Sequence, residues 1–444
     1  MKKFIDTIKA IWDIDELRKK ILFTLSLILV YRFGAQVSLP GIDPTQLANL
    51  NRQTADNSLL DLLNQFTGGA FSRASIFALG IMPYISASIV VQLMGIAVPY
   101  LQKLQKAGES GRKKITQITR WLTIAVTLIQ GPSYVYNLYN QLPKSAFLIE
   151  QTWLFVTLAV IVLSAGTIFA MWLGEKITDK GIGNGISLLI MVGIMARMPS
   201  AFLQEFTNRV TEQNGGPMLL LFEIVMWLLV IAASIMLVKA YRPVPVQYAQ
   251  RAVGGGYEKN IFGARQYLPL KLNAAGVMPI IFAQALMFFP RMFASFSDSD
   301  MASTVKTTFS NIFNPWYNLV FALMIIIFTF FYTAITVQTN KIADDLKRSN
   351  GFVPGIRPGT DTANFLDDIL SKITFPGAIF LALIAVLPAF AHSMFPGMIR
   401  SWAMFYGGTS LLILVGVAID TIQQGEAYLL NRHYDSLMKS GRKR

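Results

Sequence analysis

Long apolar runs recur along the whole chain, and short polar segments separate them. A helix needs about 20 apolar residues to cross the roughly 30 Å hydrocarbon core of a bilayer, and these runs approach that length. The sequence therefore predicts an all-α polytopic membrane protein with ten transmembrane helices. The expected spans are residues 21–39, 74–98, 121–138, 153–173, 183–198, 217–238, 273–290, 315–338, 375–392 and 403–424.

Basic residues indicate how these helices are oriented. Most of the 39 lysines and arginines fall in segments that lie on one side if the N-terminus is cytoplasmic. The positive-inside rule then places both termini in the cytoplasm of a multi-pass protein. The predicted organisation is an amphipathic N-terminal helix over 1–20, two five-helix halves over 21–201 and 217–424, and a cytoplasmic tail over 425–444.

The net charge of +14 follows mostly from this topology, but two inner loops are longer than a helix connection needs. In loop 241–272, alternating apolar residues predict an extended hairpin or finger. In loop 339–374, the helical run KIADDLKR and a second helix from Asp361 bracket a loop that presents Arg357 between two prolines. Both loops are therefore candidate docking surfaces.

A repeat relates the two halves, and since five spans is an odd number the second half enters the membrane in the opposite sense. GIMP at 80–83 matches GVMP at 276–279, and GISLLI at 185–190 matches GTSLLI at 408–413. Glycine and proline inside these four helices predict that the helices face inward. The isoleucines that align are then either ordinary packing residues or a hydrophobic constriction that closes a channel by dewetting. They are Ile81, Ile85, Ile186, Ile190, Ile281 and Ile413.

A short amphipathic stretch, SLLDLLNQF at 58–66, precedes the second span. Ser58 and Asp61 form a capping box, and Gly68 and Gly69 stop the helix. Nine residues are too short to cross a bilayer, so the stretch is either an interfacial helix or a re-entrant plug over 58–72.

Several chemistries are absent. The chain has no cysteine and two histidines, so disulfides, iron–sulfur clusters and ordinary zinc sites are excluded. Phosphate-loop, hydrolase-elbow and zinc-protease motifs are also missing, so we expect no enzyme, cofactor or metal. Glu223, His392 and Asp420 lie near helix ends, where water can solvate them. Arg32 lies deep within the first span and is expected to pair with a backbone carbonyl or with a partner helix. An inverted-repeat secondary transporter, the alternative function, needs buried ionisable groups along its path, which disfavours it.

Six strings in this order resemble the bacterial SecY/Sec61-α family of protein-conducting channels. They are PGID (40–43), GGAFSRASIFALGIMPYISASIVVQL (68–93), GESGRKKI (108–115), MWLGEKITDKGIGNGIS (171–187), FVPGIRPG (352–359) and FYGGTSLLI (405–413). The resemblance implies two pseudo-symmetric inverted halves in the bacterial plasma membrane. Such a channel passes unfolded secretory polypeptides and releases hydrophobic segments laterally into lipid.

The resemblance also implies roles for particular residues. The pore ring that it implies consists of the same six isoleucines that the internal repeat aligns. The resemblance implies a lateral gate between helices 2, 3, 7 and 8 at Ser86, Gln92, Gln130 and Asn273. The implied plug residues are Leu59, Leu60, Leu62, Leu63, Phe66, Gly68, Gly69 and Phe71. The implied partner-binding residues are Arg357, Arg242, Arg251 and Lys271; Arg242 is followed here by Pro243 where the family commonly has a second basic residue.

The implied partners supply what the chain lacks. Because the chain has no nucleotide site, the free energy for translocation comes from the SecA ATPase, a translating ribosome or the membrane potential. The membrane potential contributes about 2.3 kcal/mol per charge per 100 mV. The resemblance further implies SecE and SecG subunits, secretory preproteins with signal sequences, membrane lipids, and accessory SecDF or a YidC-type insertase.

Overall fold

Helices make up most of the chain in the computed structural model, which describes Trp12 and residues 14–46, 64–148, 153–211, 216–248, 266–294, 304–305, 307–309 and 311–441. The α-helices are α2 (Asp15–Gly34), α5 (Met82–Ala97), α6 (Pro99–Lys106), α7 (Gly108–Gln141), α8 (Trp153–Lys180), α9 (Gly185–Val210), α10 (Gly216–Lys239), α11 (Met278–Ala294), α13 (Pro315–Thr336), α14 (Thr339–Arg348), α15 (Thr360–Met394), α16 (Arg400–Ala403) and α17 (Gly408–Gly441). The strands are β1 (Tyr241–Tyr248), β2 (Gln266–Lys271) and β3 (Gly351–Phe352).

Every predicted apolar run overlaps one of these helices. Among the described residues, five helical segments are long and apolar enough to cross a membrane: α8, α9, α10, Pro315–Arg348 and α15. A bent pair, Met82–Gly95 with Pro99–Gln105, adds a sixth if it counts as one span. The structure is therefore that of a helical membrane protein.

The second span begins later than the sequence predicts. Residues 74–81 form turns, and helix α5 starts at Met82 with Pro83 in its first turn. Ala74 and Gly80 both have positive φ, at 44° and 53°, which is incompatible with a continuous right-handed helix. The prediction that Gly80 and Pro83 lie inside this helix is wrong: Gly80 precedes α5, and Pro83 is in its first turn, where proline is favoured because no backbone N–H is needed.

The matching string in the second half adopts the same local structure. Gly276 has φ 64°, and α11 starts two residues later at Met278, as α5 starts two residues after Gly80. Only glycine adopts such φ values without a steric cost from a Cβ atom. The sequence repeat thus corresponds to a repeated turn before each helix.

Several helices extend well past their apolar runs. The predicted helix from Asp361 and the predicted span 375–392 form the single 35-residue helix α15, which contains Pro376. Helix α9 continues to Val210, and α7 includes the GESGRKKI string. Apolar periodicity marks the lipid-length part of a helix, whereas its polar ends depend on packing.

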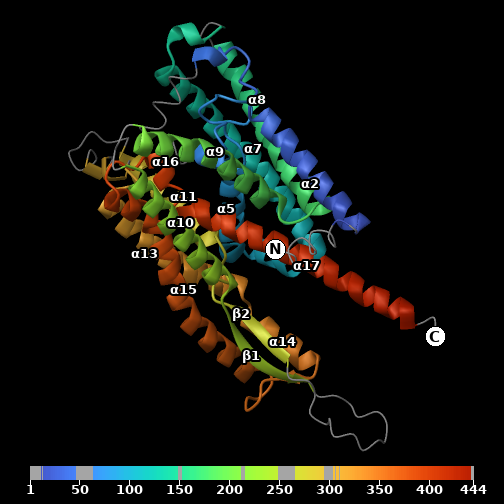
Figure 1. Ribbon diagram of the computed structural model, residues 1–444. Coiled ribbons are helices and arrows are strands. Elements are labelled where there is room, and N and C mark those ends of the chain that lie inside the picture. The colour runs from blue at the N-terminus through green and yellow to red at the C-terminus, as the bar shows by residue number, and fades with distance from the viewer. Residues whose placement is uncertain are drawn as a thin grey trace, which may run out of the picture.

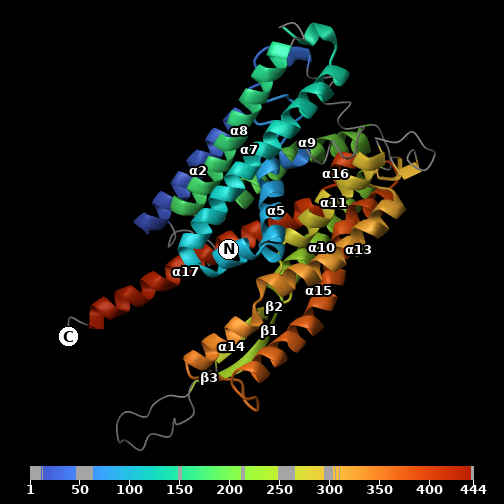
Figure 2. The same ribbon diagram turned by 180° about the vertical axis from the view of Figure 1, so that it is seen from behind.

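The helices form two groups (Figures 1 and 2). In one group α8 packs against α2 and α7, and α7 packs against α5; in the other, α13 packs against α11 and α15. Helix α9 lies between the groups, because it contacts α2 and α8 on one side and α10, α16 and α17 on the other.

A three-stranded antiparallel sheet in the order β2-β1-β3 lies at one end of the second group (Figure 1), and we call this end the sheet end. The predicted finger at 241–272 is thus confirmed as strands β1 and β2, while the all-α prediction omits them. One apolar cluster packs the sheet onto α14 and α15: Val244, Val246, Leu270, Leu346, Val353, Leu366 and Leu370. We call the opposite end the α16 end.

Candidate functional site

The six predicted pore isoleucines belong to one region of the core. Ile81, Ile190 and Ile413 are buried members of the largest hydrophobic cluster. Ile85, Ile186 and Ile281 are half-buried and pack against the same cluster. They come from the helices that the repeat aligns and the turn before α5, but many other residues share this cluster. A ring around an opening therefore stays a prediction.

Residues 64–74, which include the described part of the plug predicted at 58–72, form a buried irregular segment. Helical conformation ends at Phe66, and Gly68 and Gly69 have φ 65° and 89°. The Asn64 side chain accepts from the backbone N–H of Ser72 at 3.1 Å. The segment is thus held by its own polar side chains, while the predicted plug residues Leu59, Leu60, Leu62 and Leu63 lie outside the described residues.

Neighbouring helices fasten this segment. The Tyr134 hydroxyl of α7 donates to the carbonyl of Phe71 at 2.7 Å, and its ring meets the Phe71 ring edge-on. Arg32 of α2 donates to the carbonyl of Gly68 at 3.3 Å, so of the two predicted partners the carbonyl is the one found.

The segment also touches α9 backbone to backbone. A Cβ atom added to Gly193 would lie 2.7 Å from the carbonyl oxygen of Phe66 and 3.3 Å from the nitrogen of Gly68. No side chain fits between these backbones, so Gly193 is required for the segment to sit against α9.

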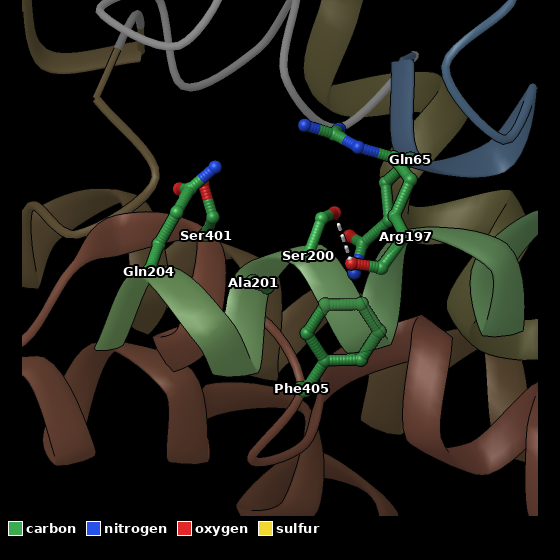
Figure 3. Close-up of a pocket in the computed structure, with 7 residues that line it drawn as sticks. All are labelled: Gln65, Arg197, Ser200, Ala201, Gln204, Ser401 and Phe405. Carbon is green, nitrogen blue, oxygen red and sulfur yellow. Dashed lines mark hydrogen bonds between the residues drawn. The ribbon is translucent and has the colours of Figure 1, made fainter. Parts of the chain in front are cut away.

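A small polar pocket lies beside this contact between the 64–74 segment and α9 (Figure 3). Its walls come from the 64–66 segment, α9 and the α16 region: Gln65, Arg197, Ser200, Ala201, Gln204, Ser401 and Phe405. Within the described part of the chain, the buried Nε2 of Gln65 has no hydrogen-bond partner. The 64–66 segment therefore contacts a polar surface on one side and an apolar cluster on the other.

The predicted gate residues include one that joins the two helix groups. The hydroxyl of Tyr332 on α13 donates to Oε1 of Gln92 on α5 at 3.3 Å, and both groups are partly buried. Ser86, Gln130 and Asn273 are half-buried, and the buried Oδ1 of Asn273 has no partner among the described residues. Sequence reasoning missed Tyr332, since its apolar run shows only a lipid-spanning helix.

The two predicted docking loops meet in one sheet. Strand β1 pairs with β2 inside the first loop and with β3 in the second, where Gln247 faces Phe352. Arg242, Lys271 and Arg357 are exposed, while Arg251 lies outside the described residues. The sequence treats these loops as separate surfaces, but hydrogen bonding makes them one platform.

The prediction that Glu223 is solvated near a helix end is wrong. Its side chain is fully buried and pairs with Arg209 of α9 at 2.6 Å; Arg209 also pairs with Glu205 at 2.8 Å. Glu205 and Arg209 lie on α9 beyond residue 198, where the predicted fifth span ends. The sequence after that residue contains no motif that indicates a buried cluster of charges. Asp420, by contrast, is exposed as expected, and His392 is half-buried beside Phe313.

Comparisons with known proteins agree with this geometry. The protein family SecY matches residues 75–422. Protein translocase subunit SecY of Streptomyces scabiei is 40% identical over 442 residues, covering 96% of this chain and 97% of the relative. The chain belongs to the SecY family.

Solved structures share the fold. One described as a protein-conducting channel superposes with a TM-score of 0.63 at 17% identity, covering 92% of this chain and 91% of its own. Sec61 in a canine ribosome–channel complex gives a TM-score of 0.58 at 17% identity, with the same coverage. The overall arrangement of helices in this SecY-family chain is thus the one seen in protein-conducting channels.

Proposed function

We propose that this chain is the channel subunit of a protein translocase. It passes unfolded secretory polypeptides across the bacterial plasma membrane and releases hydrophobic segments sideways into lipid. One observation carries the proposal: a protein translocase subunit SecY matches it over nearly the full length of both chains. The chain itself is a conduit and no enzyme, so the work comes from a partner.

In this proposal, ten helices cross the membrane as two inverted halves with both termini in the cytoplasm. The repeated turns at Gly80 and Gly276 support the duplication, since they share a sign of φ and a position before a helix. The sheet end then faces the cytoplasm and the α16 end faces outward, in line with the charge distribution.

The pore is closed by the six isoleucines, and the 64–74 segment sits against them as a plug. Ile81 and Ile190 share a cluster with Phe66 and Ala70, which supports contact between the proposed ring and plug. An apolar ring excludes hydrated ions by dewetting and fits loosely around varied side chains.

The gate opens between α5 and α13, where Gln92 and Tyr332 meet. A single neutral hydrogen bond contributes about 0.5–1.5 kcal/mol, which a signal sequence with better apolar contacts offsets. Ser86, Gln130 and Asn273 make the rest of this seam tolerant of water.

The sheet platform binds the partner that drives translocation, either the SecA ATPase or a ribosome. Exposed Arg242, Lys271 and Arg357 support contact with acidic protein or with phosphate. The channel also assembles with SecE and SecG, and it works with SecDF and a YidC-type insertase.

A cross-link tests the pore directly, because the chain has no native cysteine. With cysteine at Ile190 and one cysteine in a stalled secretory precursor, we expect a disulfide that requires both signal sequence and SecA. Cysteine at Leu203, exposed on the same helix, is the matched control and should not react. Reaction at Leu203 without reaction at Ile190 would refute the pore assignment and reopen the transporter alternative.

A further inference from the structure

Three charged side chains are fully buried where α9 meets α10. Glu205 and Arg209 are one turn apart on α9, and Arg209 Nε donates to Oε1 of Glu205 at 2.8 Å. Arg209 Nη2 donates to Oε1 of Glu223 on α10 at 2.6 Å. None of the three side chains is exposed, so the planar fork of arginine joins the two helices without help from solvent.

The same cluster holds the loop before α16. Arg209 Nη1 donates to the carbonyl of Pro396 at 2.9 Å, and the backbone N–H of Ile399 donates to Oε2 of Glu205 at 2.8 Å. The Tyr406 hydroxyl donates to the backbone carbonyl of Glu223 at 2.6 Å. Since α17 begins at Gly408, the cluster ties α9, α10 and the entrance to α17 into one unit.

The charges in this cluster do not balance if both carboxyl groups are ionised. Both oxygens of Glu205 accept hydrogen bonds, but the buried Oε2 of Glu223 has no partner among the described residues. A second buried carboxylate would carry a charge that neither a cation nor a donor compensates, which is costly away from water. One proton on Glu223 makes the three groups neutral together.

The two helix groups are thus joined unequally. At the gate, α5 and α13 share one neutral hydrogen bond of 3.3 Å. At the α16 end, charge-assisted hydrogen bonds join the guanidinium of Arg209 on α9 to Glu223 of α10 at 2.6 Å and to the carbonyl of Pro396 at 2.9 Å. A hydrogen bond to a buried charged group contributes more than a neutral hydrogen bond, and losing it leaves the charge uncompensated. We therefore expect the contact at the gate to break before the contacts that hold α9 to α10 and to the 396–399 loop.

We propose that Glu205, Arg209 and a proton-bearing Glu223 form a hinge pin that keeps α9, α10 and the 396–399 loop together while the gate opens. Arg209 is fully buried and acts as a positioning residue that joins α9 to α10 and to the 396–399 loop. The opening motion rests on the proposed channel function, but the pin and its proton are properties of the resting structure.

Infrared spectroscopy of the full-length complex in lipid tests the proton. The spectrum of the native chain should contain a protonated-carboxyl C=O band that is lost in Glu223→Gln. Asp420→Asn, which removes an exposed carboxyl group of α17, is the control and should leave the band. A band unchanged by Glu223→Gln would overturn the assignment of the proton.

Spin labels test the pin. They are placed on cysteines at Leu203 of α9 and Met218 of α10, which are 62% and 79% exposed. The label–label distance should stay narrow in the native chain and in Glu223→Gln when a signal peptide binds. In Arg209→Met it should broaden, and the translocation rate into vesicles should fall at least about tenfold, since two carboxyl groups lose their partner. Glu223→Gln should translocate within about twofold of the native rate, because the neutral amide can replace a neutral acid.

If Arg209→Met does not fold, Arg209→Lys serves instead, because it keeps the charge but loses the fork. A narrow distance and a native translocation rate in the folded Arg209 variant would overturn the pin. If the native chain itself fails to translocate with SecA present, the proposed function fails, while the distance and the infrared band still decide the pin.

Discussion

Replacing Gly193 with alanine should displace the 64–74 segment from its packed position against α9. The added Cβ would lie 2.7 Å from the carbonyl oxygen of Phe66, whereas ordinary contacts begin at 3.4 Å. Both neighbours are backbone, so neither rotates away, and the segment or the helix must move. Overpacking of this kind costs about 1–3 kcal/mol, which is a roughly 5- to 150-fold change in an equilibrium constant.

A buried cysteine reports this displacement. Ser72 is 2% exposed, so a cysteine there reacts with a membrane-impermeant maleimide only when the segment leaves its seat. If opening and closing are fast relative to labelling, the labelling rate follows the open population. We therefore expect Gly193→Ala to raise the labelling rate of Ser72→Cys by roughly 5- to 150-fold.

A glycine in open space provides the control. Gly425 of α17 has no neighbour within 4 Å of its added Cβ, so Gly425→Ala gains the same helix propensity, about 1 kcal/mol, without a clash. It should leave the labelling rate unchanged. An equal rate in Gly193→Ala and Gly425→Ala, with both proteins folded, would show that the close approach does not hold the segment.

Three further predictions concern the gate, the platform and the turn after α2. Tyr332→Phe removes the hydrogen bond to Gln92, so we expect signal-peptide binding to tighten by about fivefold, for roughly 1 kcal/mol, measured by titration of a fluorescent signal peptide. Arg357→Glu should abolish SecA-driven translocation into vesicles without lowering the melting temperature. Hydrogen bonds from the backbone and side chain of Thr45 hold the pKa of Asp43 below its ordinary value. A lowered folded-state pKa stabilises this turn above the unfolded pKa, and this stabilisation is lost as pH falls through the folded value, so exchange protection of the Thr45 amide should drop only in strong acid.

Each of these has its own control. Tyr332→Phe keeps the ring packed near Phe282, so unchanged affinity would assign the gate seam to apolar contacts alone. Arg348→Glu, on α14 of the same end, matches the charge change of Arg357→Glu; equal losses would point to bulk charge and refute a specific contact. Asp43→Asn keeps an acceptor oxygen without a titrating group, and acid-dependent exchange in this variant would contradict the role of the carboxylate.

The linear pattern of residues determined the class of this protein and most of its helices. Apolar runs of membrane length predict helices because a lone helix in lipid satisfies its own backbone. Alternation predicted the finger at β1, and the glycine–proline strings marked equivalent points in both halves. These signals are local, so a single sequence carries them in full.

Contacts between distant segments were decided only by the tertiary structure. Nothing near Gln92 in the sequence indicates Tyr332, and nothing in loop 241–272 indicates pairing with Phe352. Glu223 shows the reason most clearly: as one acid near a helix end it reads as solvated, and only the packing of α9 beside α10 buries it against Arg209. The free energy of a charge depends on what surrounds it in space, and chain order does not specify that surrounding.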